Sequence, residues 1–254
     1  MYTRVKTEDE IEAMRTGGRM LAAVLQLLKT KVSAGISTGQ LDEIAARELK
    51  ALGGEAAFLR YEGFPRSICI SVNDEVVHGI PREDKIIKDG DIISLDLGVR
   101  YKGMITDSAI TVVCGQGSQR SRDLIRYTEQ SLQEGLSVIK DGCRVGDISF
   151  AVQKVLEKHN YGIVRDLVGH GVGHSVHEDP NIPNYGRANT GPELKRGMTI
   201  AVEPMATLGR EAVKIDPDGW TVRTQDRSPA AHFEHTVLVT EAGCEILTLA
   251  PEAP

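Results

Sequence analysis

The sequence lacks several features that would assign it to a specialised class of protein. It has no apolar run near the roughly 20 residues that a bilayer-spanning helix needs, and its beginning, Met1–Glu10, lacks the apolar stretch of a signal peptide. The four cysteines are scattered and form no Cys-x-x-Cys pair, which favours reduced thiols in the cytoplasm. The net charge is −6 without a long block of either sign, so nothing indicates a nucleic-acid or membrane partner.

Two acidic strands are the most informative feature that is present. Lys88–Asp96 and Lys195–Glu203 each open with a basic, glycine-bearing turn and end an apolar strand on a carboxylate, six residues after the glycine. The offset between them is 107 residues, and the same offset superposes Gly35–Leu41 on Gly142–Ile148. Two segments that share one offset predict a duplicated half-domain, with Asp96 and Glu203 near a central axis. Two ordinary strand openings that match by chance are the alternative.

The apolar pattern predicts two helices followed by strands in each half. A capping box at Thr7 and Glu10 opens the first helix, and a second runs from Thr38 to Gly53-Gly54. Short β-branched runs over 67–113 predict antiparallel strands. The second half repeats this order, with helices near 120–139 and 146–159 and strands from about 163 onward. We therefore expect an α+β fold, with helices packed on one face of a curved antiparallel sheet.

Asp96 and Asp107 flank a predicted hairpin. A tight turn near Tyr101-Lys102-Gly103 would place the two carboxylates directly opposite each other, with Cβ atoms roughly 4.5–5.5 Å apart. Two ionised carboxylates at that distance repel each other unless a cation lies between them. The strand before Asp96 is strongly apolar, which argues against an ordinary surface residue; a buried aspartate that closes a turn is the alternative.

The segment Gly169–Glu178 contains three histidines separated by glycines: His170, His174 and His177. Glycine permits close backbone approach to a ligand, and imidazole is a preferred ligand of transition metals. A structural role in the core or at the surface is the alternative for each ring, and it applies most to His174.

Two further carboxylates, Glu203 and Glu234, come from predicted strands, Glu234 within Ala231–Val239. Four carboxylates and one histidine in a single pocket need about four units of positive charge, which two divalent cations supply. A histidine ligand disfavours calcium, and the absence of paired cysteines disfavours a structural zinc site.

Several motifs together resemble the type I methionine aminopeptidases. They are His78-Gly79-Ile80-Pro81, Ser94-Leu95-Asp96, Thr106-Asp107, Gly169–Gly173, Ala201–Pro204 and Asp226-Arg227-Ser228 with Glu234-His235-Thr236. The resemblance runs from the first helix to Glu245, in the family's order and at its spacings. It implies the pita-bread fold, a single catalytic domain over residues 1–254 with pseudo-symmetric halves at about 8–115 and 116–250. The lack of an N-terminal zinc-binding extension and of a long insertion before Glu234 is typical of the short bacterial form.

The resemblance also implies a role for each site residue. The expected metal ligands are Asp96, Asp107, His170, Glu203 and Glu234. Of these, Asp107 and Glu234 would bridge two metals, Asp96 would hold one, and His170 with Glu203 the other. Glu203 would also carry a proton, His78 and His177 would contact the scissile peptide, and the methionine pocket would be lined by Tyr61, Phe64, Cys69 and Trp220.

The implied cofactors are two divalent cations per subunit, and the sequence leaves open whether they are Co, Mn, Fe or Zn. Two positions differ from some relatives. Val176 stands where these have a bulky aromatic residue, which leaves the shape of the pocket open. Ala230 replaces a serine that contributes to a monovalent-cation site, so this third cation is also left open.

We therefore expect a methionyl aminopeptidase, a metal-dependent exopeptidase. It would remove the N-terminal methionine of newly made proteins when the second residue is small, by attack of a water that bridges the two metals. Its partners would be nascent polypeptide N-termini, with the ribosome as a candidate place of action, and it would act as a cytoplasmic monomer without nucleic acid or membrane.

Two alternatives remain from the sequence. One is an Xaa-Pro aminopeptidase on the same fold, although such enzymes usually carry a large extra N-terminal domain. The other is a non-catalytic binding module, although such proteins usually lose metal ligands and all five are present here.

Overall fold

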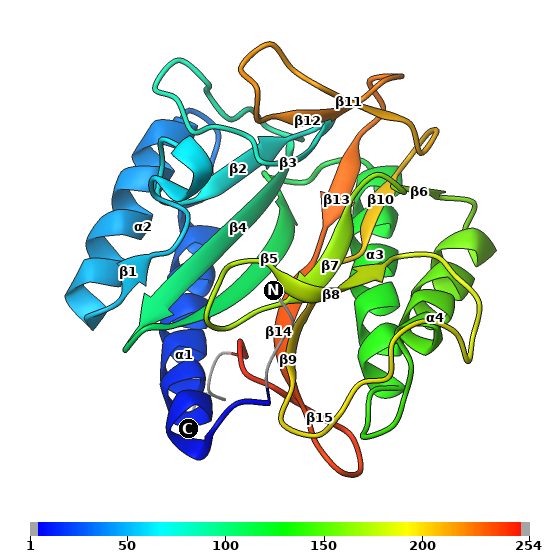
Figure 1. Ribbon diagram of the computed structural model, residues 1–254. Coiled ribbons are helices and arrows are strands. Elements are labelled where there is room, and N and C mark those ends of the chain that lie inside the picture. The colour runs from blue at the N-terminus through cyan, green and yellow to red at the C-terminus, as the bar shows by residue number, and fades with distance from the viewer. Residues whose placement is uncertain (1–4, 250–254) are drawn as a thin grey trace.

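The computed structural model describes residues 5–249, which form helices flanking a central sheet (Figure 1). Residues 1–4 and 250–254, and with them the expected outer limits of the domain at residues 1, 250 and 254, lie outside the described part. The first half contains α1 (Glu8–Lys31), α2 (Thr38–Leu52), β1 (Glu55–Ala56), a 3-10 turn (Tyr61–Gly63), β2 (Cys69–Val72), β3 (Glu75–Val77), β4 (Ile92–Tyr101) and β5 (Met104–Val113). The second half contains α3 (Gln119–Ser137), α4 (Val145–Lys158), β6 (Gly162–Ile163), β7 (Val168–Gly171), β8 (Glu178–Pro183), β9 (Thr199–Val202), β10 (Met205–Thr207), β11 (Val213–Ile215), β12 (Val222–Thr224), β13 (Ala230–His232), β14 (Glu234–Val239) and β15 (Cys244–Ile246). No helix within residues 5–249 is both long and apolar enough to cross a membrane.

The predicted helix boundaries are confirmed, and their local causes are visible. The Thr7 hydroxyl accepts from the Glu10 amide at 3.3 Å, and the Glu10 carboxylate accepts from the Thr7 amide at 2.8 Å, which closes the capping box of α1. α2 begins behind a second capping box, between Ser37 and Gln40, and ends at Gly53 in the left-handed conformation with φ of 84°. These contacts join residues close in sequence, which is why the box of α1 and the end of α2 at Gly53 could be predicted. The box between Ser37 and Gln40 was not predicted.

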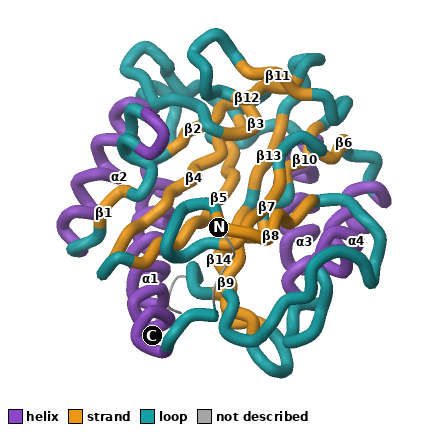
Figure 2. Tube along the Cα trace, viewed as in Figure 1, coloured by secondary structure: helices purple, strands orange, loops and turns teal. Residues whose placement is uncertain are grey.

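The central sheet has nine strands, in the order β1-β4-β5-β14-β9-β7-β8, with β2 also paired to β4 and β15 to β14. Figure 2 shows its strands in the middle of the molecule, with α1 and α2 on one side and α3 and α4 on the other. The pairing of β5 with β14 joins the two halves of the chain. Two smaller three-stranded sheets, β13-β10-β6 and β11-β12-β3, complete the fold.

The predicted duplication is confirmed in the backbone hydrogen bonds. Contacts in the first half recur in the second half at the same offset of 107 residues. The repeated contacts are the β-bridges Ser37–Ile86 and Arg144–Glu193, and the bonds from Gly35 N–H to Ile87 O and from Gly142 N–H to Leu194 O, both 2.9 Å. The strands β4 and β9 therefore occupy equivalent places on either side of the β5–β14 junction.

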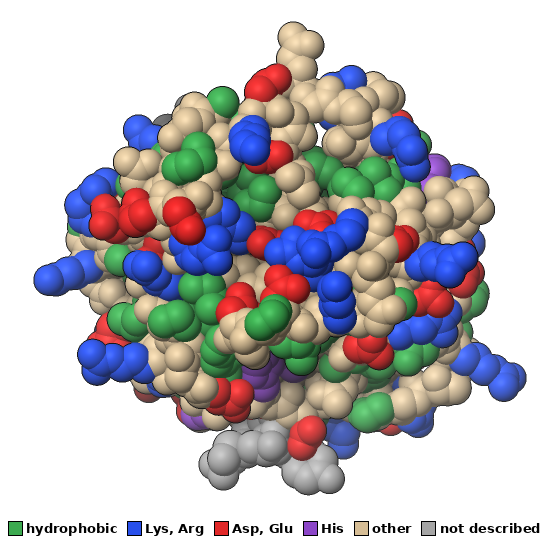
Figure 3. Space-filling model, turned by 90° about the horizontal axis from the view of Figure 1, so that it is seen from above, with side chains coloured by type: hydrophobic (Ala, Val, Ile, Leu, Met, Phe, Trp, Pro, Cys, Tyr) green, Lys and Arg blue, Asp and Glu red, His purple; other side chains and the backbone are tan. Residues whose placement is uncertain are grey.

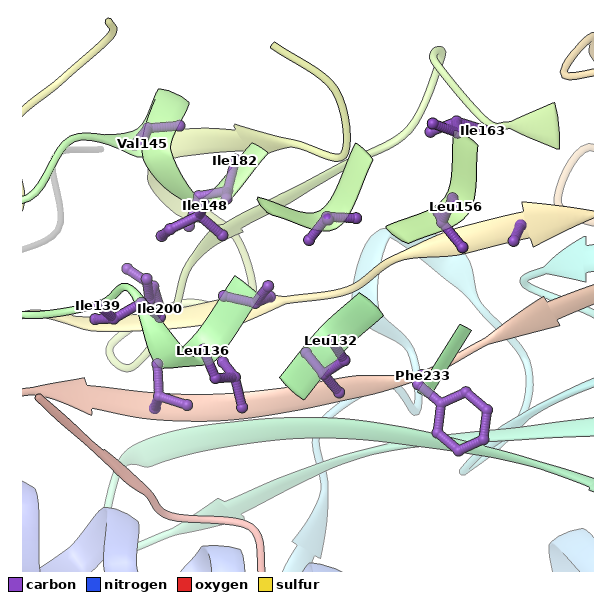
Figure 4. Close-up of a cluster of buried hydrophobic side chains, with 14 of the residues drawn as sticks. Leu132, Leu136, Ile139, Val145, Ile148, Leu156, Ile163, Ile182, Ile200 and Phe233 are labelled. Atoms are coloured by element: carbon purple, nitrogen blue, oxygen red, sulfur yellow. The ribbon is translucent and has the colours of Figure 1, made fainter. Parts of the chain in front are cut away.

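Each half buries its own apolar core between its helices and the sheet. Figure 4 shows the core of the second half, where Leu132 and Leu136 of α3 and Ile148 of α4 pack near Ile200 of β9. The first half has an equivalent cluster, in which Leu95 and Leu97 of β4 pack with α1 and α2. Side chains alternate along a strand, so the neighbours of these residues point to the opposite face, where the candidate site lies.

Close backbone packing explains the second of the two adjacent glycines in the middle of α1. A β-carbon on Gly18 would lie 2.0 Å from the carbonyl oxygen of Leu247, which has little room to move because it belongs to the backbone. Glycine costs helix stability of about 1 kcal/mol relative to alanine. At this position the absence of a side chain permits α1 to approach the C-terminal segment.

The loops beside β3, β11 and β12 are held by a network of ion pairs. Arg223 of β12 pairs with Asp74, Glu75 and Asp216. Asp218 accepts from the backbone amide of Trp220 at 2.9 Å and so shapes the loop between β11 and β12. Figure 3, which views this end of the molecule, shows acidic and basic side chains interspersed. Trp220 is thus carried by an ordered loop.

Strand boundaries differ from prediction in three places. β4 continues to Tyr101 rather than ending at Asp96, and β9 ends one residue before Glu203. Pro204 follows Glu203 and has no amide hydrogen to donate to the ladder. The expected strand Ala231–Val239 is divided at Phe233 into β13 and β14, which belong to different sheets.

Candidate metal centre

The five expected ligands come from five neighbouring strands of the central sheet. They are Asp96 on β4, Asp107 on β5, Glu234 on β14, Glu203 directly after β9 and His170 on β7. Ala109 of β5 pairs with Asp96 on one side and with Glu234 on the other, so these carboxylates lie in one row across the sheet. The row crosses the junction between the halves, as the duplication predicts for a central site.

The prediction that Asp96 and Asp107 lie directly opposite each other is wrong. Asp96 pairs with Ala109 and Asp107 with Gly98, so the carboxylates are offset by two residues. The cause is the turn Lys102-Gly103, whose left-handed φ values of 48° and 82° place its centre one position later than expected. Because side chains alternate along each strand, an offset of two residues keeps both carboxylates on one face as diagonal neighbours.

Several carboxylate oxygens at the centre are buried without a hydrogen bond. Asp96 Oδ1, Asp107 Oδ1 and Glu234 Oε1 have no such partner within residues 5–249. One ligand atom from each of Asp107, His170 and Glu234 lies within 4.8 Å of the others. A buried, unpaired polar atom costs free energy. A cation coordinated by these oxygens removes that cost, so the donor set fits a metal centre.

Burial also changes the protonation of this cluster. It raises the pKa of Asp107 and Glu203 to about 8, for Asp107 with the added effect of the Glu203 charge. It raises the pKa of Asp96 and Glu234 as well, together with the charges of neighbouring carboxylates. Four adjacent carboxylates in a dry site therefore retain protons near neutral pH until positive charge replaces them.

His170 is oriented as a metal ligand. Its Nδ1 lies 2.9 Å from the carbonyl oxygen of Gly171, and because a carbonyl only accepts, Nδ1 must carry the hydrogen. The lone pair is then on Nε2, which lies 3.5 Å from Oε1 of Glu203. Burial lowers the pKa of His170 to about 3, so the ring is neutral and can coordinate.

The other expected histidines divide into two groups. His177 contacts His170 in a T-shaped arrangement with ring centroids 4.4 Å apart, and its Nδ1 lies 3.0 Å from the Tyr61 hydroxyl. His78 lies near Trp220, with centroids 6.4 Å apart, and burial lowers its pKa to about 4. His174 instead bonds Glu10 at 2.7 Å and does not line the cavity described next.

A cavity of about 180 Å³ opens over the carboxylates, and all eleven expected site residues line it. Its apolar wall includes Phe64 and Trp220, which pack edge to face with centroids 5.2 Å apart. Cys69 pairs with Asp96 across β2 and β4, and burial raises the pKa of its thiol. The thiol is therefore neutral and contributes an apolar, polarisable surface rather than a nucleophile.

Some residues that form this site were not predicted from the sequence. Phe58, Leu167 and Met205 line the cavity, but nothing in their local sequence distinguishes them from core residues. His232 is buried at the end of β13, with Nε2 3.3 Å from Oε2 of Glu203. The sequence did indicate His232. It lies two residues before Glu234 in a segment that was expected to be one strand, and side chains two residues apart in a strand point to the same face.

Relatives with similar sequences are methionine aminopeptidases. The model of metallopeptidase family M24 matches residues 12–241. Methionine aminopeptidase 1 of Bacillus subtilis (strain 168) is 48% identical over 243 residues, which cover 96% of this chain and 98% of that protein. The methionine aminopeptidase of Escherichia coli (strain K12) is 41% identical over 253 residues, which cover 98% of this chain and 95% of that protein.

Solved structures agree with these relatives. The crystal structure of methionine aminopeptidase from Thermotoga maritima has a TM-score of 0.96 at 42% identity and covers 97% of this chain and 99% of that chain. The X-Pro aminopeptidase from Thermotoga maritima MSB8 has a TM-score of 0.78 at 20% identity. It covers 98% of this chain but 63% of that chain, so it shares the fold alone. The pita-bread fold expected from the sequence is confirmed.

Proposed function

The chain belongs to the methionine aminopeptidases of metallopeptidase family M24 and removes N-terminal methionine, and on this premise we propose how its residues do so. The proposed substrate is a nascent polypeptide whose second residue is small. The proposed centre holds two divalent cations. The observation that carries this proposal is the convergence of buried, unpaired carboxylate oxygens with one oriented imidazole in a single cavity.

In this proposal, five residues hold the cations. The residues that would hold them are Asp96, Asp107, His170, Glu203 and Glu234. Divalent cations at such a site polarise a carbonyl group and lower the pKa of coordinated water. A monovalent cation near Ala230 would need to be held by backbone oxygens, because the methyl side chain offers none.

Glu203 is the proposed proton carrier. Its carboxylate lines the cavity, where it can exchange a proton with groups bound there. It would take the proton of the attacking water and deliver it to the leaving amine.

His177 and His78 are proposed to contact the scissile peptide. If the Tyr61 hydroxyl donates to Nδ1 of His177, then Nε2 of that ring carries the hydrogen. That N–H would stabilise the charge that develops on the peptide oxygen. His78, on the Trp220 side of the cavity, would hold the peptide nitrogen.

Specificity follows from the walls of the cavity. Phe64, Trp220 and Cys69 form a mainly apolar slot with sulfur and aromatic surface, which suits a thioether side chain. A charged first residue would lose its hydration there without compensation. The second residue must pass close to His78 and His177, so a small side chain should be accepted best.

Peptide cleavage by metal-free protein reconstituted with single metals tests this proposal. Met-Ala-Ser should be trimmed, while Met-Leu-Ser and Leu-Ala-Ser stay largely intact. Comparable release from all three peptides would indicate a broad aminopeptidase. Preferential cleavage before proline would favour an Xaa-Pro enzyme, and metal binding without cleavage of any peptide would favour a binding module.

We also infer that the protein acts as a monomer in the cytoplasm on nascent N-termini, including those at the ribosome. All four cysteines are free, and three of them are buried, as suits a reducing compartment. Light scattering should give a mass near 27.6 kDa. A stable dimer would contradict the monomer assignment.

A further inference from the structure

The Glu203 carboxylate lies between two imidazole rings. Oε1 is 3.5 Å from Nε2 of His170, and Oε2 is 3.3 Å from Nε2 of His232. His170 belongs to the expected ligand set, whereas His232 has no place in it. The role of this second imidazole is therefore open.

One ligand atom from each of Glu203, His232 and Glu234 lies within 4.8 Å of the others, but His232 is not oriented as a metal ligand in the way His170 is. A metal-bound histidine almost always donates its second ring N–H to a carbonyl, carboxylate or water. Nδ1 of His170 does so to Gly171, whereas neither ring nitrogen of His232 has a hydrogen-bond partner within residues 5–249, although Nε2 faces Oε2 of Glu203 at 3.3 Å. Without an acceptor at Nδ1, the ring hydrogen is better placed on Nε2, facing the carboxylate. His232 also does not line the cavity, so it does not contact a substrate there.

The backbone of His232 is anchored on both sides. Its amide donates to the Thr111 hydroxyl at 2.9 Å, and the same hydroxyl donates to its carbonyl oxygen at 2.6 Å. His232 also pairs with Met205, two residues after Glu203. Its side chain is 2% exposed, so the ring has little freedom to move away from Glu203.

We propose that His232 is a positioning residue, which donates its Nε2 hydrogen to Oε2 of Glu203 and so orients the carboxylate that carries the proton. This inference rests on the role proposed above for Glu203. The contact at 3.3 Å is within reach of a hydrogen bond, and the terminal torsion of a glutamate is soft enough to bring the oxygen into line. The ring would set the direction of the carboxylate.

Three substitutions separate this role from the alternatives. His232→Gln keeps an N–H donor near the position of Nε2, His232→Asn keeps an amide that is too short to reach, and His232→Leu removes the donor. Each variant is compared with the wild type by kcat and KM on Met-Ala-Ser and by calorimetric titration with manganese. The visible spectrum of the cobalt form and thermal unfolding are recorded in addition. His159→Gln, which changes a histidine stacked on Tyr127 of α3, is the matched control.

For a positioning role, kcat of His232→Leu should fall roughly 10- to 100-fold, as for other groups that orient a reactive residue from behind. KM, metal stoichiometry and the cobalt spectrum should change little. His232→Gln should recover most of the loss and His232→Asn should not. The comparison of His232→Gln with His232→Asn distinguishes a positioning role from packing even if His232→Leu fails to fold.

Other outcomes would overturn the inference. Loss of a metal equivalent or a changed cobalt spectrum in His232→Gln would make His232 a ligand. Equal losses of kcat in the Gln and Asn variants would show that His232 contributes packing alone. Unchanged kcat in all variants would show that it takes no part in the reaction. If wild-type protein fails to cleave Met-Ala-Ser, the proposed function fails instead, before any variant is compared.

Discussion

Cation binding is expected to release at least two protons from the metal-free protein near neutral pH. The reason is that burial raises the pKa of Asp107 and Glu203 to about 8, so both carboxyls hold a proton at pH values below about 8. Burial and neighbouring charges raise the pKa of Asp96 and Glu234 as well, so their protons add to this number. Coordination requires the ionised form, and the protons must leave. His170 adds no proton to this number, because burial lowers its pKa to about 3.

The size of the pH effect on metal affinity follows from these pKa values. Below about pH 8, the ionised fraction of each group falls roughly tenfold per pH unit, so Asp107 and Glu203 alone weaken the apparent affinity roughly 100-fold per unit. Affinity should therefore rise steeply from about pH 6 to pH 8 and then level off. The stability of the metal-free protein should change in the opposite direction. Because the folded state binds more protons than the unfolded state between the ordinary carboxyl pKa and about 8, its stability should fall as pH rises through that window.

Isothermal titration of metal-free protein with manganese tests this prediction. The titration is repeated at about pH 6, 7 and 8, in buffers with different ionisation enthalpies, which counts the protons released. Asp107→Asn is the matched control and should release about one proton fewer, because the amide holds no exchangeable carboxyl proton. Equal affinities at low and high pH, or binding without proton release, would refute the assigned environment of these carboxylates.

Three further predictions concern single residues. Replacing His78 or His177 with alanine should lower turnover by roughly 10²- to 10⁴-fold, as loss of a positioned proton donor does, while metal content stays normal; loss of a metal from either variant would contradict its placement at the peptide. Tyr61→Phe removes the hydroxyl that contacts Nδ1 of His177, and loss of a hydrogen bond worth about 0.5–1.5 kcal/mol should lower kcat/KM about two- to tenfold; unchanged kinetics would show that the phenol does not orient the ring. Gly18→Ala should destabilise the fold by about 1–3 kcal/mol in denaturant unfolding, because the added methyl group meets the carbonyl oxygen of Leu247; a gain in stability, as helix propensity alone predicts, would contradict this packing argument.

The sequence by itself determined the features that depend on neighbouring residues or on a repeated pattern. The capping box of α1 joins Thr7 to Glu10, and Gly53 ends α2 because it adopts a left-handed conformation at little cost. The offset of 107 residues was also visible in the sequence, since the same turn and strand residues recur at that spacing. The structure has equivalent β-bridges in both halves at the same offset. From these features came the fold class and the central position of Asp96 and Glu203.

The tertiary structure alone decided how side chains from distant segments meet. A turn shifted by one position changed the pairing of Asp96 and Asp107 from opposite to diagonal, and only the formed hairpin reveals that register. The contact between His232 and Glu203 depends on where β13 ends relative to β9, two strands that belong to different sheets. Local hydrogen bonds are set by residues a few positions apart. Such long-range contacts instead depend on strand order and register, which the packing of both cores establishes together.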